Sequence, residues 1–140
     1  TAGAARGHGF WLTSELVEGP RLDRWLAGRP PARAVLEVVR ELVQTLAWLH
    51  GEGLVHGDLK PANILMAPRP TLIDFGLAEI STSIEDKATD VLVFKKSSKK
   101  DEFEEFWRGY AKESKNAKAV FRQLMEIETR GRYVARAQAG

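Results

Sequence analysis

Two short polar motifs lie near the middle of the sequence: residues 56–63 read HGDLKPAN, and residues 73–76 read IDFG. Between them, residues 64–66 and 71–73 flank a proline-containing turn, which predicts two short strands joined as a hairpin. Pro61 stiffens the loop before the first strand, so one turn can aim Asp58 and Asn63 into the same cleft. Asp74 comes at the end of the second strand. We therefore expect these three side chains to share one polar site.

The residue types in these stretches suit phosphoryl transfer. Such a site needs a carboxylate facing the acceptor hydroxyl, ligands for a metal ion, and positive charge near the moving phosphoryl group. Asp58 is the candidate carboxylate, and Lys60 can neutralise charge that develops on the γ-phosphate. Asn63 and Asp74 are candidate ligands of Mg²⁺, an ion that prefers a few hard oxygen ligands completed by phosphates and water. The pattern predicts that Asp58 and Lys60 are catalytic and that ATP and Mg²⁺ are the cofactors.

Apolar spacing around these stretches predicts a mainly helical chain. A strand is predicted at residues 10–17, before the first helix. The predicted helices cover residues 22–27, 32–51 and 86–94, and two amphipathic helices follow an exposed linker at residues 95–100. The aromatic and aliphatic stripes of the last two helices are interpreted as core. The predicted fold class is mainly α with a small β-hairpin, α+β overall.

Composition and charge narrow the class of protein. The chain has 140 residues, of which 44% are hydrophobic and 29% charged, as in one globular domain. It has no cysteine, which excludes disulfides and thiolate metal sites. No apolar run approaches the roughly 18–20 residues of a membrane span, and no signal peptide is supported, so we expect a cytoplasmic protein. The basic end, with Arg130, Arg132 and Arg136, is read either as a surface for a polyanion such as RNA or as a solvated helix end.

In order and spacing, the two stretches resemble the catalytic loop (residues 56–63) and metal motif (residues 74–76) of the protein kinases. The resemblance implies a kinase-like C-terminal lobe with a hinge at residues 12–22. It implies a nucleotide pocket that includes the gatekeeper Ser14, the Glu15 carbonyl, the Val17 amide, Leu65 and Ile73. It also implies two structural supports: His56 hydrogen-bonds backbone near Asp74, and Asp90 braces the catalytic loop from below.

Residues 76–90 (GLAEISTSIEDKATD) and the FEEF start of the next helix resemble a narrower family. This is the small atypical kinase of the KEOPS (EKC) complex, which supports threonylcarbamoyl modification of adenosine in tRNA. The resemblance implies a serine/threonine kinase or ATPase subunit, similar to EC 2.7.11.1. Its implied partners are the threonylcarbamoyl-transferase subunit, a small regulatory subunit, and tRNA through the basic tail. One departure is Lys60-Pro61-Ala62, where this family more often has small hydroxylated residues.

The Gly-rich loop and phosphate-gripping lysine of a kinase should precede the hinge. Residues 1–9 contain only a loose glycine cluster and are interpreted as a frayed segment, and residues 10–140 as the C-terminal lobe, with its last helices and basic tail at residues 101–140. The N-terminal lobe is thus expected to be largely absent. We interpret the chain as a fragment of a longer, fused or split kinase, nearly inactive by itself.

Two other functions stay open at this stage. A small-molecule phosphotransferase of the aminoglycoside-kinase type also carries HGD, then Asn, then a later Asp, although EDKATD and the glycine of DFG speak against it. A non-catalytic docking scaffold is the second alternative. His50 is expected to have a packing role, and the loop residues Ser81, Thr82 and Ser83 are candidate autophosphorylation sites.

Overall fold

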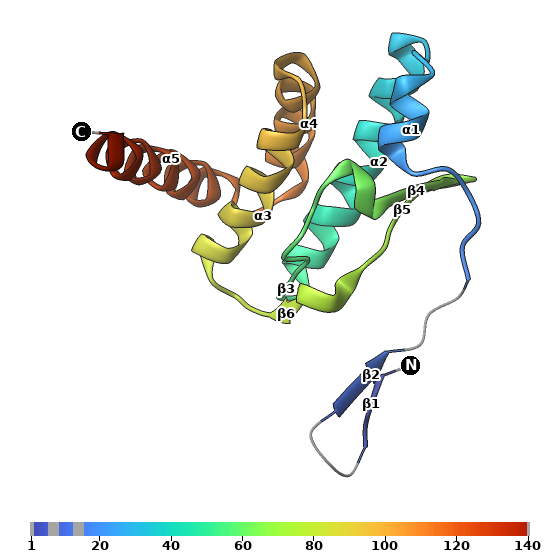
Figure 1. Cartoon of the computed structure of the whole chain (residues 1–140), viewed down its shortest axis with the longest axis horizontal. Helices are drawn as coiled ribbons and strands as arrows, with labels where there is room; N and C mark the ends of the chain where they lie inside the picture. Colours follow the sequence, from blue (N-terminus) through green and yellow to red (C-terminus); the bar gives the residue numbers. More distant parts are fainter. Residues whose placement is uncertain (1, 6–8, 13–15, 140) are drawn as a thin grey trace.

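The computed structural model describes residues 2–5, 9–12 and 16–139 (Figure 1). Its helices are α1 (Leu22–Ala27), α2 (Ala32–Gly51), α3 (Ile84–Ser97), α4 (Lys100–Glu113) and α5 (Ala117–Ala139). Its strands are β1 (Ala2–Ala5), β2 (Gly9–Leu12), β3 (Leu54–Val55), β4 (Ile64–Ala67), β5 (Arg69–Leu72) and β6 (Glu79–Ile80). Short 3-10 turns occur at Pro61–Asn63 and Phe75–Leu77. The mainly helical fold class with a small β-hairpin is confirmed.

Helix α2 forms the centre of the core. Its buried residues follow helical spacing, as the sequence predicts, and they include Val39, Leu42, Val43 and Leu46. Helix α4 packs along α2, and the close approach is possible because Gly109 has no side chain: a Cβ there would lie 3.0 Å from Cγ1 of Val43. The core between these helices therefore fixes the position of α4 relative to the loop that follows α2.

The strands form three antiparallel pairs: β1 with β2, β3 with β6, and β4 with β5. The β4–β5 hairpin confirms the predicted pair of short strands. The sequence predicts no strand before Phe10, whereas the structure has β1, which pairs with β2 in a hairpin apart from the helical body (Figure 1). Of the predicted strand at residues 10–17, β2 covers residues up to Leu12, and Leu16 and Val17 have no regular structure, while residues 13–15 lie outside the described residues.

The predicted linker at residues 95–100 is wrong, because helix α3 continues to Ser97 and α4 begins at Lys100. Tertiary contacts explain the extension. The Nζ of Lys95 lies 2.8 Å from both carboxylate oxygens of Glu128 in α5, and 5.4 Å from the centre of the Phe103 ring. The lysine-rich sequence indicates an exposed segment, but Lys95 in α3 contacts both α4 and α5.

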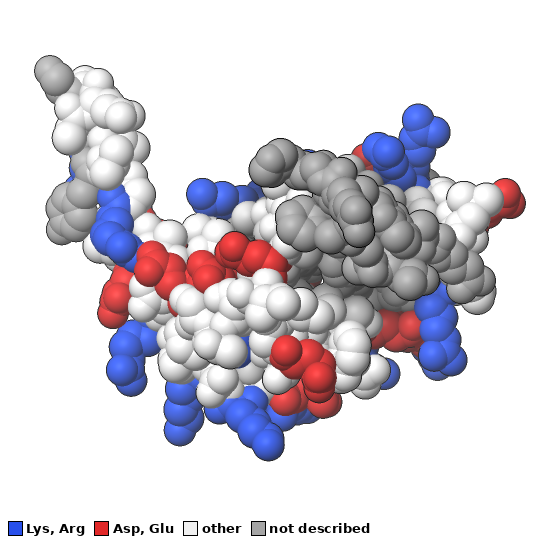
Figure 2. Space-filling view, turned by 90° about the horizontal axis from the view of Figure 1, so that it is seen from below, with Lys and Arg blue, Asp and Glu red and all other residues white. Residues whose placement is uncertain are grey.

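The C-terminal part of α5 extends away from the body (Figure 1). Ala117, Val120 and Leu124 anchor the first half of the helix in the core, whereas every described side chain from Thr129 onward is exposed. Figure 2 shows this projecting end beside a body that carries basic side chains along one edge and a cluster of acidic ones near the base of the projection. Among the described residues, no helix has the length and apolar composition needed to cross a membrane.

Candidate active site

The β4–β5 hairpin brings the two predicted metal ligands to its open end. Ile64 pairs with Leu72, so the residue before β4 and the residue after β5 lie opposite each other. The N–H of Ile73 donates to the carbonyl of Asn63 at 2.9 Å, which extends the pairing by one step. Asp74 is the next residue along the chain. The hairpin register, set by local strand pairing, is therefore what places Asn63 beside the backbone that leads into Asp74.

Asp58, Lys60 and Asn63 form one hydrogen-bonded group. The Nδ2 of Asn63 donates to the carbonyl of Asp58 at 2.9 Å and to its Oδ2 at 3.0 Å. The Nζ of Lys60 lies 2.9 Å from the same Oδ2. The Lys60 ammonium, with a further contribution from Asn63, lowers the pKa of the Asp58 carboxyl below its ordinary value. The carboxylate is therefore ionised at neutral pH and held in one orientation.

Asn63 is suited to bind a cation through its remaining oxygen. Both hydrogen bonds of its side chain are donated by Nδ2, and within the described part of the chain its Oδ1 accepts none. Asn63 is buried, with 7% of its surface exposed. Its two hydrogen bonds to Asp58 fix the side-chain orientation and hence the direction of Oδ1. One carboxamide and one carboxylate, with phosphate oxygens and water, is a donor set that fits Mg²⁺. The described residues contain no group of three His, Cys, Asp or Glu side chains that could hold a metal by itself.

Asp74 has a left-handed backbone conformation, with φ 60° and ψ 65°. Non-glycine residues rarely adopt this region, and aspartate is among the few that tolerate it. The backbone of Gly76 lies close to the Asp74 side chain: a Cβ at Gly76 would be 3.3 Å from Oδ1 of Asp74. The ring of Phe75 packs on the ring of His56, with centroids 4.7 Å apart. Asp74 itself is exposed, just beyond the end of the hairpin. The next residue, Phe75, packs on His56 of the catalytic loop.

Gly57 explains how the catalytic loop passes so close to the segment after Asp74. Its φ is +84°, and a Cβ added there would lie 2.3 Å from the carbonyl oxygen of Leu77. Only glycine fits both constraints. Gly57 therefore lets the backbone at Leu77 lie directly against the catalytic loop.

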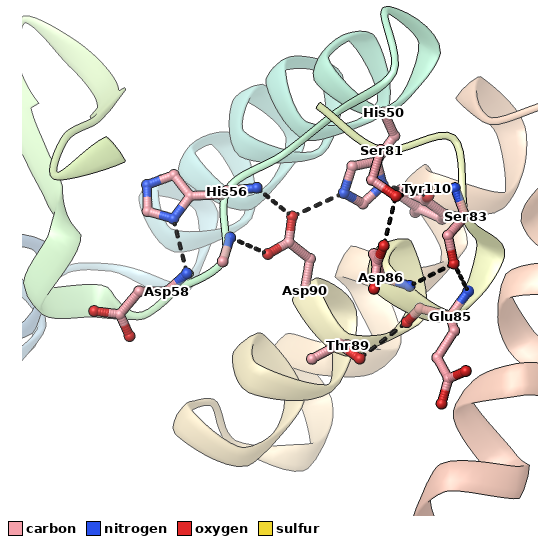
Figure 3. A network of polar contacts seen from close by, with 11 residues as sticks. His50, His56, Asp58, Ser81, Ser83, Glu85, Asp86, Thr89, Asp90 and Tyr110 are labelled. Atoms are coloured by element: carbon pink, nitrogen blue, oxygen red, sulfur yellow. Dashed lines mark hydrogen bonds and ion pairs between the residues drawn. The ribbon is translucent and has the colours of Figure 1, made fainter. Parts of the chain in front are cut away.

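Asp90 supports the catalytic loop as predicted from the sequence (Figure 3). Its Oδ2 accepts from the N–H of His56 at 2.7 Å, and its Oδ1 accepts from the N–H of Gly57 at 2.8 Å. His56 in turn links the loop to the hairpin: its Nε2 donates to the carbonyl of Ile73 at 2.9 Å, and its Nδ1 accepts from the N–H of Asp58 at 3.2 Å. His56 and Asp90 therefore connect α3, the loop and the backbone at Ile73, just before Asp74.

Sequence reasoning missed two further members of this support. His50, at the end of α2, places Nε2 3.0 Å from Oδ2 of Asp90, and its Nδ1 lies 2.7 Å from the hydroxyl of Tyr110 in α4. His50 was expected only to pack, and Tyr110 only to join an apolar stripe. No spacing in the sequence relates these residues, which come from different helices. A histidine at the end of an apolar helix face was the only available signal.

Of the predicted nucleotide-binding residues, Leu65 lies on β4 and Ile73 directly after β5. Ser14 and Glu15 fall outside the described residues. The segment that follows them runs beside β4, because the N–H of Met66 donates to the carbonyl of Pro20 at 2.8 Å and Arg21 bridges to Leu65. Val17, Leu65 and Ile73 are half-buried. Leu65 thus lies on the strand that carries this hinge segment, and Ile73 lies one residue beyond β5.

The three basic residues predicted to contact a polyanion all lie on the projecting part of α5. Arg130 reaches back to α3, where its Nη2 lies 2.9 Å from Oε1 of Glu85, and both side chains are exposed. The Nε of Arg132 donates to the backbone carbonyl of Glu128 at 3.4 Å. Arg136 is exposed. The structure therefore groups them on one helix, α5, and among the residues that it describes it shows no contact between them and the group formed by Asp58, Lys60 and Asn63.

Comparison with known proteins identifies the family to which this chain is similar. The protein kinase domain family matches residues 4–97. A probable bifunctional tRNA threonylcarbamoyladenosine biosynthesis protein of Methanosphaera stadtmanae is 37% identical over 128 residues, which is 86% of this chain and 22% of that protein. The KEOPS complex subunit Bud32 of Pyrococcus abyssi is 33% identical over 132 residues, which is 87% of this chain and 60% of that protein. The EKC/KEOPS complex subunit Tp53rkb of Mus musculus is 36% identical over 112 residues, covering 71% of this chain and 46% of the mouse protein.

The chain thus spans less than two thirds of the length of each of these relatives. The match to the kinase domain, in contrast, covers more than half of the chain and contains the hinge segment, the catalytic loop and the metal motif. The same residues form the hydrogen-bonded site around Asp58, Asn63 and Asp90. From both the match and the geometry, the chain belongs to the protein kinase domain family.

Proposed function

We propose that the chain contributes the catalytic loop and metal motif of an ATP-dependent phosphotransferase or ATPase. Asp58 is ionised and fixed by Lys60 and Asn63, as a carboxylate that orients an acceptor hydroxyl or water must be. Lys60 lies within contact distance of that carboxylate, where it can also offset negative charge that grows on a transferring phosphoryl group. Both roles use side chains that belong to one short loop.

Asn63 and Asp74 would hold Mg²⁺, through Oδ1 of the carboxamide and the carboxylate of Asp74. A bound ion would supply positive charge to offset that of the nucleotide phosphates. The chain supplies the orientation: Asp58 fixes the Asn63 side chain, and the hairpin register fixes the backbone before Asp74. Val17, Leu65 and Ile73, with Ser14 and Glu15, are proposed to contact the nucleotide base.

We further propose that the protein acts as the kinase-like subunit of a KEOPS complex that supports threonylcarbamoyladenosine formation in tRNA. The observation that carries this proposal is the short connection from Asp74 to Asp90. After a single 3-10 turn and the two-residue strand β6, Ser83 caps α3 by accepting from the N–H groups of Glu85 and Asp86. The EDKATD segment then brings Asp90 directly under the loop, with little chain for a peptide-binding platform.

The names of the relatives support the same assignment, since they include KEOPS subunits and a bifunctional threonylcarbamoyladenosine biosynthesis protein. The proposed partners are the threonylcarbamoyl-transferase subunit and a small regulatory subunit. The tail residues Arg130, Arg132 and Arg136 are proposed to meet tRNA. Their exposure on a projecting helix favours a polyanion contact, and Arg132 and Arg136, four residues apart in α5, lie on one face, where both can reach phosphates.

The experiment is reconstitution of tRNA threonylcarbamoylation with the intact protein and the other KEOPS subunits of its organism. Wild-type protein should support modification, and Asp58→Asn should abolish it while complex assembly on a sizing column is unchanged. An Arg130→Gln/Arg132→Gln/Arg136→Gln variant should weaken tRNA binding and flatten its dependence on salt. Full modification activity with Asp58→Asn would refute a catalytic role and favour the docking scaffold.

A further inference from the structure

A buried chain of hydrogen bonds runs from α4 to the catalytic loop (Figure 3). It begins at the hydroxyl of Tyr110, passes through the two ring nitrogens of His50, and reaches the carboxylate of Asp90, which accepts from the backbone of His56 and Gly57. Tyr110 and His56 are 0% exposed, Asp90 1% and His50 2%. Water therefore does not compete for these groups, and each one depends on its protein partner.

The carboxylate of Asp90 dictates the protonation of the ring next to it. An ionised carboxylate can only accept hydrogen bonds, so every contact to it must be made by a donor. His50 must therefore carry a proton on Nε2, which lies 3.0 Å from Oδ2. In a neutral imidazole, Nδ1 then has a lone pair and needs a donor. The hydroxyl of Tyr110, 2.7 Å away, can supply it.

Tyr110 keeps the proton that this arrangement requires. Burial raises the pKa of the Tyr110 hydroxyl to about 12, against a hydrogen bond with the Ser114 side chain that lowers it, and the charge of Asp90 adds a smaller increase. The ring is held by its neighbours, since it stacks on Phe106 with centroids 6.0 Å apart and contacts Trp107 at 5.5 Å. The hydroxyl is thus a permanently protonated donor in a fixed position at neutral pH.

We propose that Tyr110 is a positioning residue for the catalytic loop: its hydroxyl gives Nδ1 of His50 the donor that it needs, and so holds the Nε2-protonated ring against the carboxylate of Asp90, which faces the N–H groups of His56 and Gly57. Without the hydroxyl, the lone pair of Nδ1 would be buried with no donor. The His50 ring would then be free to move from this position, and the carboxylate of Asp90 would lose a donor that holds it toward the loop amides. The kinetic test of this role rests on the catalytic site proposed above, whereas the NMR and hydrogen-exchange tests do not.

The test compares wild-type protein with Tyr110→Phe, which removes one oxygen and keeps the aromatic stack. The control is Phe103→Leu, which disturbs the same stack of rings through the contact between Phe103 and Phe106 but touches no polar group of the network. Long-range ¹H–¹⁵N NMR at neutral pH reports the tautomer of His50, one of only three histidines in the chain. Hydrogen exchange reports the protection of the His56 and Gly57 amides.

The proposal predicts a His50 ring in the wild type that is protonated on Nε2 and accepts a hydrogen bond at Nδ1, and a ¹⁵N shift of Nδ1 in Tyr110→Phe that shows the loss of this hydrogen bond. The His56 and Gly57 amides of that variant should exchange about tenfold faster, beyond any change common to the core of α2. Phe103→Leu should change protection uniformly and leave the tautomer of His50 intact. A His50 that carries a proton on Nδ1 in the wild type would overturn the proposal. Loop protection in Tyr110→Phe that changes no more than in the α2 core would also overturn it.

Steady-state kinetics of the intact protein give a second readout. Tyr110→Phe should lower kcat for ATP turnover and leave KM for Mg·ATP unchanged, because the residue acts through the loop and not through the nucleotide contacts. An equal fall of both parameters would overturn a positioning role. If the wild type shows no turnover, the proposed function fails, while the NMR comparison still decides the role of Tyr110.

Discussion

Replacing Asp90 by asparagine tests the hydrogen bonds through which the Asp90 carboxylate holds the catalytic loop. In the wild type, three N–H donors converge on two carboxylate oxygens at 2.7, 2.8 and 3.0 Å. Asparagine keeps one oxygen, which can still accept from His56 and His50. Its NH₂ group then faces the N–H of Gly57, so two donors oppose each other at a site that is 1% exposed in the wild type.

The cost follows from the contacts that are lost. One orphaned buried donor costs roughly 1–3 kcal/mol, and each of the two remaining hydrogen bonds loses about 1 kcal/mol because its acceptor is no longer charged. We therefore expect Asp90→Asn to lower the free energy of unfolding by roughly 3–5 kcal/mol. The opposite amide rotamer is worse, since it would turn the NH₂ group toward two donors and leave both without an acceptor.

Urea denaturation followed by circular dichroism measures this cost, provided that the slope of the transition is unchanged. Asp101→Asn is the matched control, because Asp101 is an exposed aspartate in the first turn of α4 and should change stability by no more than about 0.5 kcal/mol. Equal destabilisation of the two variants would refute the claim that the hydrogen bonds of the Asp90 carboxylate stabilise the folded protein.

Three further predictions concern single positions. Gly57→Ala should cost at least about 2 kcal/mol in urea denaturation, because of its φ of +84° and the contact with the Leu77 carbonyl, whereas Gly131→Ala in α5, where a Cβ meets nothing, should be neutral or stabilising. The pKa of Tyr110 rises from 10.0 to about 12 on folding, so the unfolded state loses the Tyr110 proton first as the pH increases. The free energy of unfolding should therefore fall by roughly 3 kcal/mol between these pH values, and Tyr110→Phe should not show this fall. Asp74→Ala in the intact protein should abolish calorimetric Mg·ATP binding, and retained binding would contradict its proposed metal role.

The parts of the fold that the sequence predicts well are those set by local patterns. Residues 32–51 show helical spacing and form α2 with the same bounds. The β4–β5 hairpin follows from its flanking strand residues and prolines. Asp58 and Asn63 meet because one short loop carries both. In each case the information lies within a few turns of chain, where propensity and spacing act directly.

The features that the sequence did not predict depend on contacts between distant segments. Lys95 continues α3 because Glu128 and Phe103 receive its side chain, and neither contact is visible in the run KKSSKK. The contact between His50 and Tyr110 joins residues on α2 and α4 that no motif relates. The predicted base contacts at Ser14 and Glu15 remain predictions, because they lie outside the described residues.

The central claim is that Asn63 and Asp74 hold a metal ion on the nucleotide, and Mn²⁺·ATP tests it directly in the intact protein. Within this chain, ¹⁵N-asparagine labelling gives carboxamide signals from only two residues, Asn63 and Asn116. The account predicts that paramagnetic Mn²⁺·ATP broadens the Asn63 carboxamide beyond detection and leaves Asn116, between α4 and α5, sharp. A sharp Asn63 signal at saturating Mn²⁺·ATP would contradict the proposed site.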